Sequence, residues 1–358
     1  MLSNVRRLFK DLLRLSDIKR PWHLPLVAAL CVGLPAIIGA ALGQFPQGML
    51  ASLGAMVVLY MPKTRTAHRI VTLSLCSFGF IFCFMVGALS TIVSWLPPFA
   101  LSLTMFLVVV MSRYYLLAPP GSFFFVLVTT ISIAMPFDLP SLPTHIGLLA
   151  IGGMTSCVVC VAYSLLTEAN ALPKTDIKLD ERVNAIVLEA LFVSVFVGGS
   201  YGIALALQLN NPYWVPISCA AILQGATFRQ VWHRKIHRII GTLVGMLLAS
   251  AIFFFHPNVW VLAFLILILQ FIIEMLIVKN YGYAVIFITP LTVIMAEVTS
   301  TQVSPALLLE YRIFDIVFGS VIGFVGGAIF YKTQWLTSIE KKMDERKSLS
   351  HLFSKKKD

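Results

Sequence analysis

The sequence predicts an all-α polytopic membrane protein with about 12 transmembrane helices, arranged as two parallel six-helix repeats. Of its 358 residues, 58% are hydrophobic and only 12% are charged, whereas about a quarter of the residues of a soluble domain are charged. Long apolar runs recur along the whole chain, and several residues and one short motif of its first half recur in the same order in its second half. This composition excludes a soluble globular enzyme.

Each predicted helix is an apolar run, and about 20 helical residues are needed to cross the hydrocarbon core. In the first half the runs are residues 24–42, 48–61, 70–92, 96–112, 116–135 and 146–166. In the second half they are residues 183–207, 213–226, 239–255, 259–278, 281–296 and 313–331. The predicted organisation is therefore a cytoplasmic N-terminal segment (1–22), a first repeat (23–167), a cytoplasmic linker (168–182), a second repeat (183–331) and a basic cytoplasmic tail (332–358).

Lys and Arg residues set the predicted orientation, because they resist translocation across the membrane. With a cytoplasmic N-terminus, 26 of the 27 lie on the cytoplasmic side and Arg312 is the exception. Both termini are thus expected in the cytoplasm. The first apolar run is long, contains proline and lacks a signal-peptide cleavage site, so it is expected to stay in the protein. Residues 2–18 have the pattern of an amphipathic helix, either at the lipid interface or docked on a partner.

A net charge of +11 fits cytoplasmic loops that face anionic lipid. It does not indicate nucleic-acid binding, because no basic stretch lies in a folded polar module.

Four landmarks recur in the same order in the two halves. They are Pro46 with Pro212, His-Arg-Ile at 68–70 with the same triplet at 237–239, Gly121 with Gly282, and Gly152 with Gly319. Six helices per half give both halves the same orientation, so the repeats are expected to be related by an axis along the membrane normal, with the substrate path near it. Chance recurrence of proline and glycine in membrane helices is the alternative.

The second and eighth runs are unusually short. Fourteen residues cover roughly 21 Å of a core about 30 Å thick, and each run follows a proline, Pro46 or Pro212. Such paired short segments point to a transporter site, where unpaired N–H groups at the helix start would attract an anion. Alternatively, both helices continue through the polar residues after Met61 and Ala226 and simply tilt.

The second half contains a recognisable set of motifs. Pro-Tyr-Trp-Val-Pro at 212–216, Gln-Gly at 224–225, Arg229 and His-Arg-Ile-Ile-Gly-Thr-Leu-Val-Gly at 237–245 resemble the fusaric-acid-resistance/aromatic acid exporter (FUSC-like) family. The last helix, with Arg312, Asp315 and Gly319, is also similar to that family. In the first half Pro46 and Arg69 match the pattern, but His145 and Leu148 stand where Arg312 and Asp315 would be expected.

The resemblance implies an inner-membrane efflux protein of Gram-negative bacteria for small aromatic or other organic acids. Such proteins are often paired with a periplasmic adaptor and an outer-membrane channel, and plant malate-activated anion channels look like distant relatives. Many members carry a large cytosolic domain. This chain departs from them, because its linker has about 15 residues and its tail about 27.

Charged residues inside membrane helices are functional candidates, since each costs about 2.5–3.5 kcal/mol at a helix centre. Arg312 and Asp315 share a helix face and either neutralise each other or act separately. In the second case Arg312 receives the exported carboxylate, or Asp315 takes a proton. Glu189 and Glu274 have no evident partner in the sequence. Each is a candidate proton carrier, or a glutamate that reaches the cytoplasmic edge.

The remaining predicted substrate-binding residues are Pro46, Pro212, Tyr213, Trp214 and Arg238. The two aromatic side chains either stack on a substrate ring or belong to the interfacial aromatic belt. Arg238 belongs to one of two basic clusters, Arg229 to Arg238 and Lys63 to Arg69. These clusters either concentrate anions at the inner mouth or simply set the topology.

No metal site, cofactor motif or disulfide framework is evident. The six cysteines lie in the apolar runs, and His233 and His237 are flanked by Arg and Lys. The leading hypothesis is a proton-coupled exporter of small organic anions, not an enzyme, with its site between the second, eighth and twelfth helices. The alternatives are a passive organic-anion channel and a non-transporting scaffold that docks a periplasmic adaptor. A monomeric pseudo-dimer and a homodimer both remain open.

Overall fold

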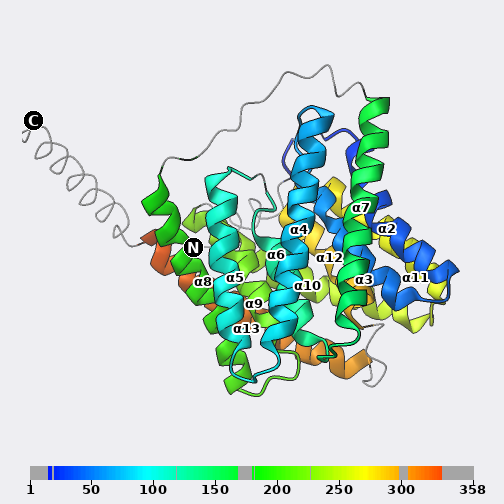
Figure 1. Cartoon of the computed structure of the whole chain (residues 1–358). Helices are drawn as coiled ribbons and strands as arrows, with labels where there is room; N and C mark the ends of the chain where they lie inside the picture. The colour runs from blue at the N-terminus through cyan, green and yellow to red at the C-terminus, as the bar shows by residue number, and fades with distance from the viewer. Residues whose placement is uncertain are drawn as a thin grey trace, which may run out of the picture.

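The computed structural model describes residues 15–17, 20–117, 119–167, 180, 182–225, 227–297 and 305–332, and the regular secondary structure of that part is helical (Figure 1). The first half forms α2 (His23–Ala41), α3 (Phe45–Ala55) with the short 3-10 helix η1 (Met56–Tyr60), α4 (Thr66–Ser90), α5 (Pro97–Tyr114), α6 (Phe123–Ala134) and α7 (Leu142–Leu166). The second half forms α8 (Val183–Ala206), α9 (Trp214–Leu223), α10 (Phe228–Phe254), α11 (Val259–Leu276), α12 (Tyr281–Glu297) and α13 (Pro305–Lys332).

The predicted all-α fold class is confirmed, and each of the twelve apolar runs coincides with one of the α-helices in the described part. The predicted amphipathic segment lies outside the described residues except for 15–17 and 20–22. Residues 168–179 and 181 of the linker, and the basic tail after Lys332, also lie outside them.

Helix length divides the described helices into two groups. Eight are long and apolar enough to cross a membrane: α2, α4, α5, α7, α8, α10, α11 and α13. Shorter apolar helices are α3 with η1, α6, α9 and α12. These short helices occupy the second and fifth positions of each half. The sequence predicted the second-position pair, and the structure adds the fifth-position pair.

The ends of the short helices follow from local residues. Near α3, the backbone leaves helical geometry at Met61, which has an extended ψ of 114°, and α9 ends at Leu223. Continuation of these two helices through the polar residues is therefore wrong. The chain before α6 turns at Gly121, whose φ of +56° suits glycine. The helix consequently begins at Phe123, seven residues later than predicted.

The basic segment before residue 239 is helical, which corrects the predicted start of that helix. Thr227 caps α10, because its side chain accepts a hydrogen bond from the N–H of Gln230. Arg and Lys are good helix formers, although their charge excludes them from an apolar run. As a result Arg234 and Arg238, four residues apart, share one face of α10.

Helices at corresponding positions of the two halves make corresponding contacts. The second helix packs against the sixth in both halves, α3 on α7 and α9 on α13, and the third packs against the fifth, α4 on α6 and α10 on α12. The halves are joined by α2 on α11 and α5 on α8. A Cβ on Gly152 would lie 1.9 Å from the Ala51 carbonyl oxygen, and one on Gly319 would lie 2.2 Å from that of Val215. Glycine therefore permits the close approach of both short helices.

The outer surface carries large apolar side chains. Phe78 of α4, Val158 of α7 and Leu247 of α10 are each about two-thirds exposed or more, at 68%, 67% and 72%. Exposed apolar side chains on so many helices are unusual for a soluble protein and suit contact with lipid. Helix length, composition and this surface together identify a multi-pass membrane protein.

Candidate functional site

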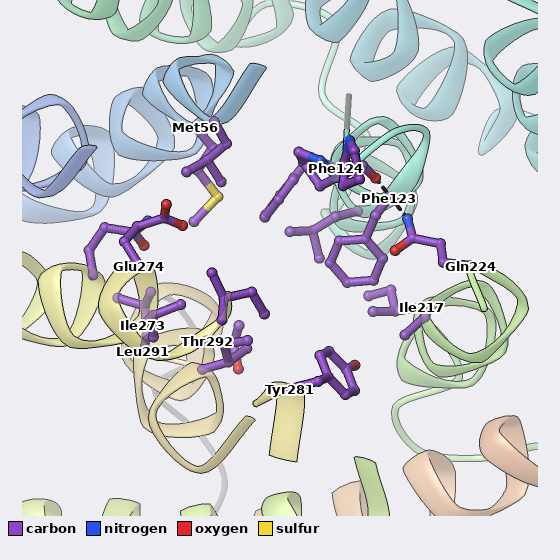
Figure 2. A pocket seen from close by; sticks show the side chains of 18 of the residues that line it. Met56, Phe123, Phe124, Ile217, Gln224, Ile273, Glu274, Tyr281, Leu291 and Thr292 are labelled. Atoms are coloured by element: carbon purple, nitrogen blue, oxygen red, sulfur yellow. Dashed lines mark hydrogen bonds between the residues drawn. The ribbon is translucent and has the colours of Figure 1, made fainter. Parts of the chain in front are cut away.

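The short helices surround a cavity of about 400 Å³ (Figure 2). Its described lining comes from η1, α6, α9 and α12, completed by α10, α11 and Arg20. Apolar side chains form most of it, including Met56, Leu59, Phe123, Phe124, Leu127, Trp214, Ile217, Ile273, Ile277, Ile288 and Leu291. The predicted site between the second, eighth and twelfth helices needs correction, since no described residue of α13 lines the cavity.

Four charged side chains are among the described lining residues: Arg20, Arg234, Arg238 and Glu274. Arg238 differs from the other three. It is 5% exposed, its buried Nε has no hydrogen-bond partner, and it belongs to none of the ion pairs of the described part. A buried guanidinium without a partner is costly, so its surroundings favour an incoming anion.

Arg234 lies one turn before Arg238 and is already engaged. Its Nη1 donates to the Ala221 carbonyl at 3.1 Å and to Gln224 Oε1 at 3.3 Å, and its guanidinium lies 5.1 Å from the centre of the Tyr281 ring. Gln224 in turn donates to the Pro120 carbonyl at 2.8 Å (Figure 2). Arg234 thus ties α10 to α9, and Gln224 ties α9 to the turn before α6.

Arg20 and Glu274 form an ion pair in the cavity wall. Arg20 Nη1 lies 2.7 Å from Glu274 Oε2 and also donates to the Glu274 carbonyl at 3.1 Å. Just upstream, the N–H of Ser16 donates to the Lys279 carbonyl at 2.9 Å. Glu274 is 6% exposed. No partner for this glutamate is evident in the sequence, because Arg20 lies 254 residues away along the chain.

Trp214 and Thr292 line the cavity, and Arg312 lies behind them. Arg312 is 1% exposed, donates to Thr292 Oγ1, and places its guanidinium 3.8 Å from the centre of the Trp214 ring. This Trp214–Arg312 contact joins α9 to α13, and Thr292 adds α12. Arg312 is thus held beside the cavity and does not line it.

Asp315 is 1% exposed, and its Oδ2 has no hydrogen-bond partner. The contacts of Arg312 with Trp214 and Thr292 hold its guanidinium against α9 and α12. Mutual neutralisation of Arg312 and Asp315 stays a prediction. Asp315 does not line the cavity.

Glu189 is also separate from the cavity. It pairs with Arg113 at the end of α5, whose Nε donates to Glu189 Oε1 at 3.1 Å. The Arg113 side chain is 48% exposed and that of Glu189 is 21% exposed. Glu189, which had no evident partner in the sequence, therefore has one on the neighbouring helix.

The predicted residues at the starts of the short helices do not reach the cavity, apart from Trp214. Pro46 is exposed near the beginning of α3, and Pro212 and Tyr213 are half-buried before α9. The expected anion-attracting start of α9 is also wrong. The N–H of Trp214 donates to the Asn211 carbonyl, and that of Val215 donates to the Pro212 carbonyl, each at 3.2 Å. Pro216, next in the chain, has no N–H.

Within the described residues, no three His, Cys, Asp or Glu side chains are grouped as a metal site would require. The six cysteines are all free thiols. His233 and His237 have ring centres 6.3 Å apart, and both lie on the basic segment of α10. The polar groups of the described cavity lining are therefore arginines, one glutamate, amides and the hydroxyls of Tyr281 and Thr292.

Comparison with known proteins confirms the family resemblance for the second half. Residues 198–326 match the family described as fusaric acid resistance protein-like. The chain is 35% identical over 147 residues to the uncharacterized membrane protein YvaC of Bacillus subtilis (strain 168), a match covering 41% of this chain and 23% of the relative. It is 28% identical over 141 residues to the uncharacterized protein YhfK of Escherichia coli (strain K12), covering 38% and 19%. The matches thus span less than a quarter of either relative. No solved structure matches the chain.

Proposed function

We propose that this chain, whose second half matches the fusaric acid resistance protein-like family, is a membrane transporter for small organic anions. The observation that carries the proposal is Arg238, a buried guanidinium in the cavity wall whose Nε has no hydrogen-bond partner and which belongs to none of the ion pairs of the described part. A bound anion would supply the partner that this charge lacks.

The rest of the cavity suits an apolar body attached to that anion. Ligand pockets are typically about 300–1,000 Å³, mostly apolar and equipped with a few polar groups, and this cavity of about 400 Å³ fits that description. Phe123, Phe124, Trp214 and Tyr281 offer rings against which a planar ligand can pack. An aromatic carboxylate such as benzoate combines the two required properties.

The proposed direction of transport follows from the charge distribution of the chain. With both termini in the cytoplasm, Arg20, Arg234 and Tyr281 lie toward the cytoplasmic side, and Trp214 at the start of α9 lies toward the opposite side. The ten residues of α9 then place about 15 Å between these ends. The cavity would load an anion from the cytoplasm of a bacterial cell, and the Trp214–Arg312 contact would block its exit.

Two further features belong to this proposal. The corresponding contacts of the two halves, α3 on α7 with α9 on α13 and α4 on α6 with α10 on α12, support two parallel repeats around an axis along the membrane normal. Proton coupling is assigned to Asp315, because it is buried with an unpartnered Oδ2, whereas Glu189 and Glu274 are held in ion pairs.

Flux of radiolabelled benzoate in proteoliposomes with an imposed pH gradient tests the function. We expect gradient-dependent flux that Arg238→Gln lowers at least tenfold. The control is Arg182→Gln, which removes a surface arginine whose side chain is 74% exposed and paired with Asp180. Flux independent of the pH gradient would instead identify a passive channel. Absence of flux in the unaltered protein would refute transport of this class and favour a scaffold.

A further inference from the structure

We infer that the Arg20–Glu274 pair makes the cavity selective for monoanions over dianions. This inference rests on the proposed function, because it concerns the anion that the same cavity binds. It assigns a specificity-determining role to Glu274, a carboxylate buried in the wall of a site proposed to bind carboxylates.

The three arginines among the described lining residues are not equivalent. Arg234 is held by two oxygen acceptors and by the Tyr281 ring. Arg20 is neutralised by Glu274 at 2.7 Å. Arg238 remains uncommitted. The described wall therefore offers one guanidinium to an incoming ligand, which suffices for one carboxylate group.

A second carboxylate on the same ligand meets an unfavourable environment. If it stays apart from the arginines, it is an unpaired charge among apolar side chains such as Leu291 and Ile273. If it takes Arg20, the Glu274 carboxylate loses its partner while it remains buried, which is comparably costly. In both cases the second carboxylate of a dianion finds no uncommitted guanidinium, because Arg234 is held by Ala221, Gln224 and Tyr281, whereas a monoanion needs Arg238 alone.

Removing the negative charge of Glu274 should abolish this preference. In Glu274→Gln the side chain keeps nearly the same shape, and Arg20 becomes a second cation available to the ligand. Benzoate and phthalate are suitable probes, since both are aromatic acids and they differ by one carboxylate group. We expect the unaltered protein to bind benzoate at least tenfold more tightly than phthalate at pH 8, and Glu274→Gln to reduce that ratio at least tenfold.

The measurement is isothermal titration calorimetry on the full chain in lipid nanodiscs. Asp138→Asn is the control for the loss of one carboxylate, because Asp138 is exposed between α6 and α7 and does not line the cavity; it should leave the ratio unchanged. Arg20→Gln alters the pair in the opposite sense. It should weaken binding of both anions, because the Glu274 charge is then uncompensated.

The outcomes separate this inference from the proposed function. Equal or tighter binding of phthalate by the unaltered protein, or an unchanged ratio in Glu274→Gln, overturns the inference even where benzoate is transported. If Glu274→Gln does not fold, stronger binding of either anion by Arg20→Gln would also overturn the inference. Selective binding without flux upholds the inference and refutes transport. Absence of binding of both anions refutes both proposals.

Discussion

Replacement of Arg238 by glutamine should change protein stability and anion binding in opposite directions. Arg238 is 5% exposed, and its Nε makes no hydrogen bond. In the ligand-free protein the substitution removes an uncompensated buried charge, so stability should stay the same or rise. In the anion complex it removes the counter-charge of the ligand. An arginine kept for structural reasons would give the reverse pattern, a loss of stability with no specific effect on binding.

The size of the binding effect follows from the interaction that is lost. A hydrogen bond to a charged group contributes about 1.5–3 kcal/mol, which corresponds to roughly 10- to 150-fold in affinity. Arg238→Lys keeps the charge but loses the planar fork that binds a carboxylate through two N–H groups. We therefore expect Arg238→Lys to bind benzoate with an affinity between those of the unaltered protein and Arg238→Gln.

Two measurements on the same nanodisc preparation check this prediction, calorimetry for benzoate affinity and thermal unfolding for stability. Arg182→Gln, which alters an exposed arginine, should change neither. Benzoate affinity within twofold of the original in Arg238→Gln would refute the assignment. A lowered unfolding temperature in the absence of ligand would contradict the view that Arg238 lacks a structural partner.

Two further predictions concern the packing that shapes the cavity. Gly319→Ala should destabilise the protein by about 1–3 kcal/mol through overpacking, because the new Cβ would lie 2.2 Å from the Val215 carbonyl oxygen. Thermal unfolding measures this loss, and Gly199→Ala, whose Cβ meets no atom within 4 Å, is the control. Equal stability of the two variants would contradict the prediction. Trp214→Leu should lower stability more than Trp214→Phe, because phenylalanine keeps a ring that Arg312 can contact. The cation–π contact of Arg312 with Trp214 at 3.8 Å contributes about 0.5–2 kcal/mol. Equal losses of stability in the two variants would show that this contact does not stabilise the protein.

Much of the fold follows from local sequence. Apolar runs mark the helices, and Pro212 and Gln224 bracket the short helix α9. The short length of α6 is less visible, because Leu116 and Leu117 extend the apolar run across a turn that ends at Gly121. The helical basic segment of α10 is hidden for the opposite reason. Its arginines interrupt the apolar run of the sequence, but the helix continues through them.

The site depends on contacts that a sequence pattern does not contain. His-Arg-Ile occurs in both halves, yet Arg69 donates to Ser164 Oγ at 3.1 Å on α7, while Arg238 lines the cavity. The neighbouring helix decides between these roles. The Arg20–Glu274 pair and the position of Arg312 over Trp214 likewise join distant segments. The sequence analysis singled out Glu274, Arg312 and Trp214, but it missed Arg20 and did not show which residues contact each other.

The most direct test of the central claim is to locate a bound anion. A structure of the protein soaked with 4-bromobenzoate would show the bromine by its anomalous signal. We predict a single strong bromine peak among the apolar side chains of the cavity, with the carboxylate within hydrogen-bond distance of Arg238. A bromine peak elsewhere, or a cavity filled by side chains with Arg238 paired to another residue of the chain, would contradict the account.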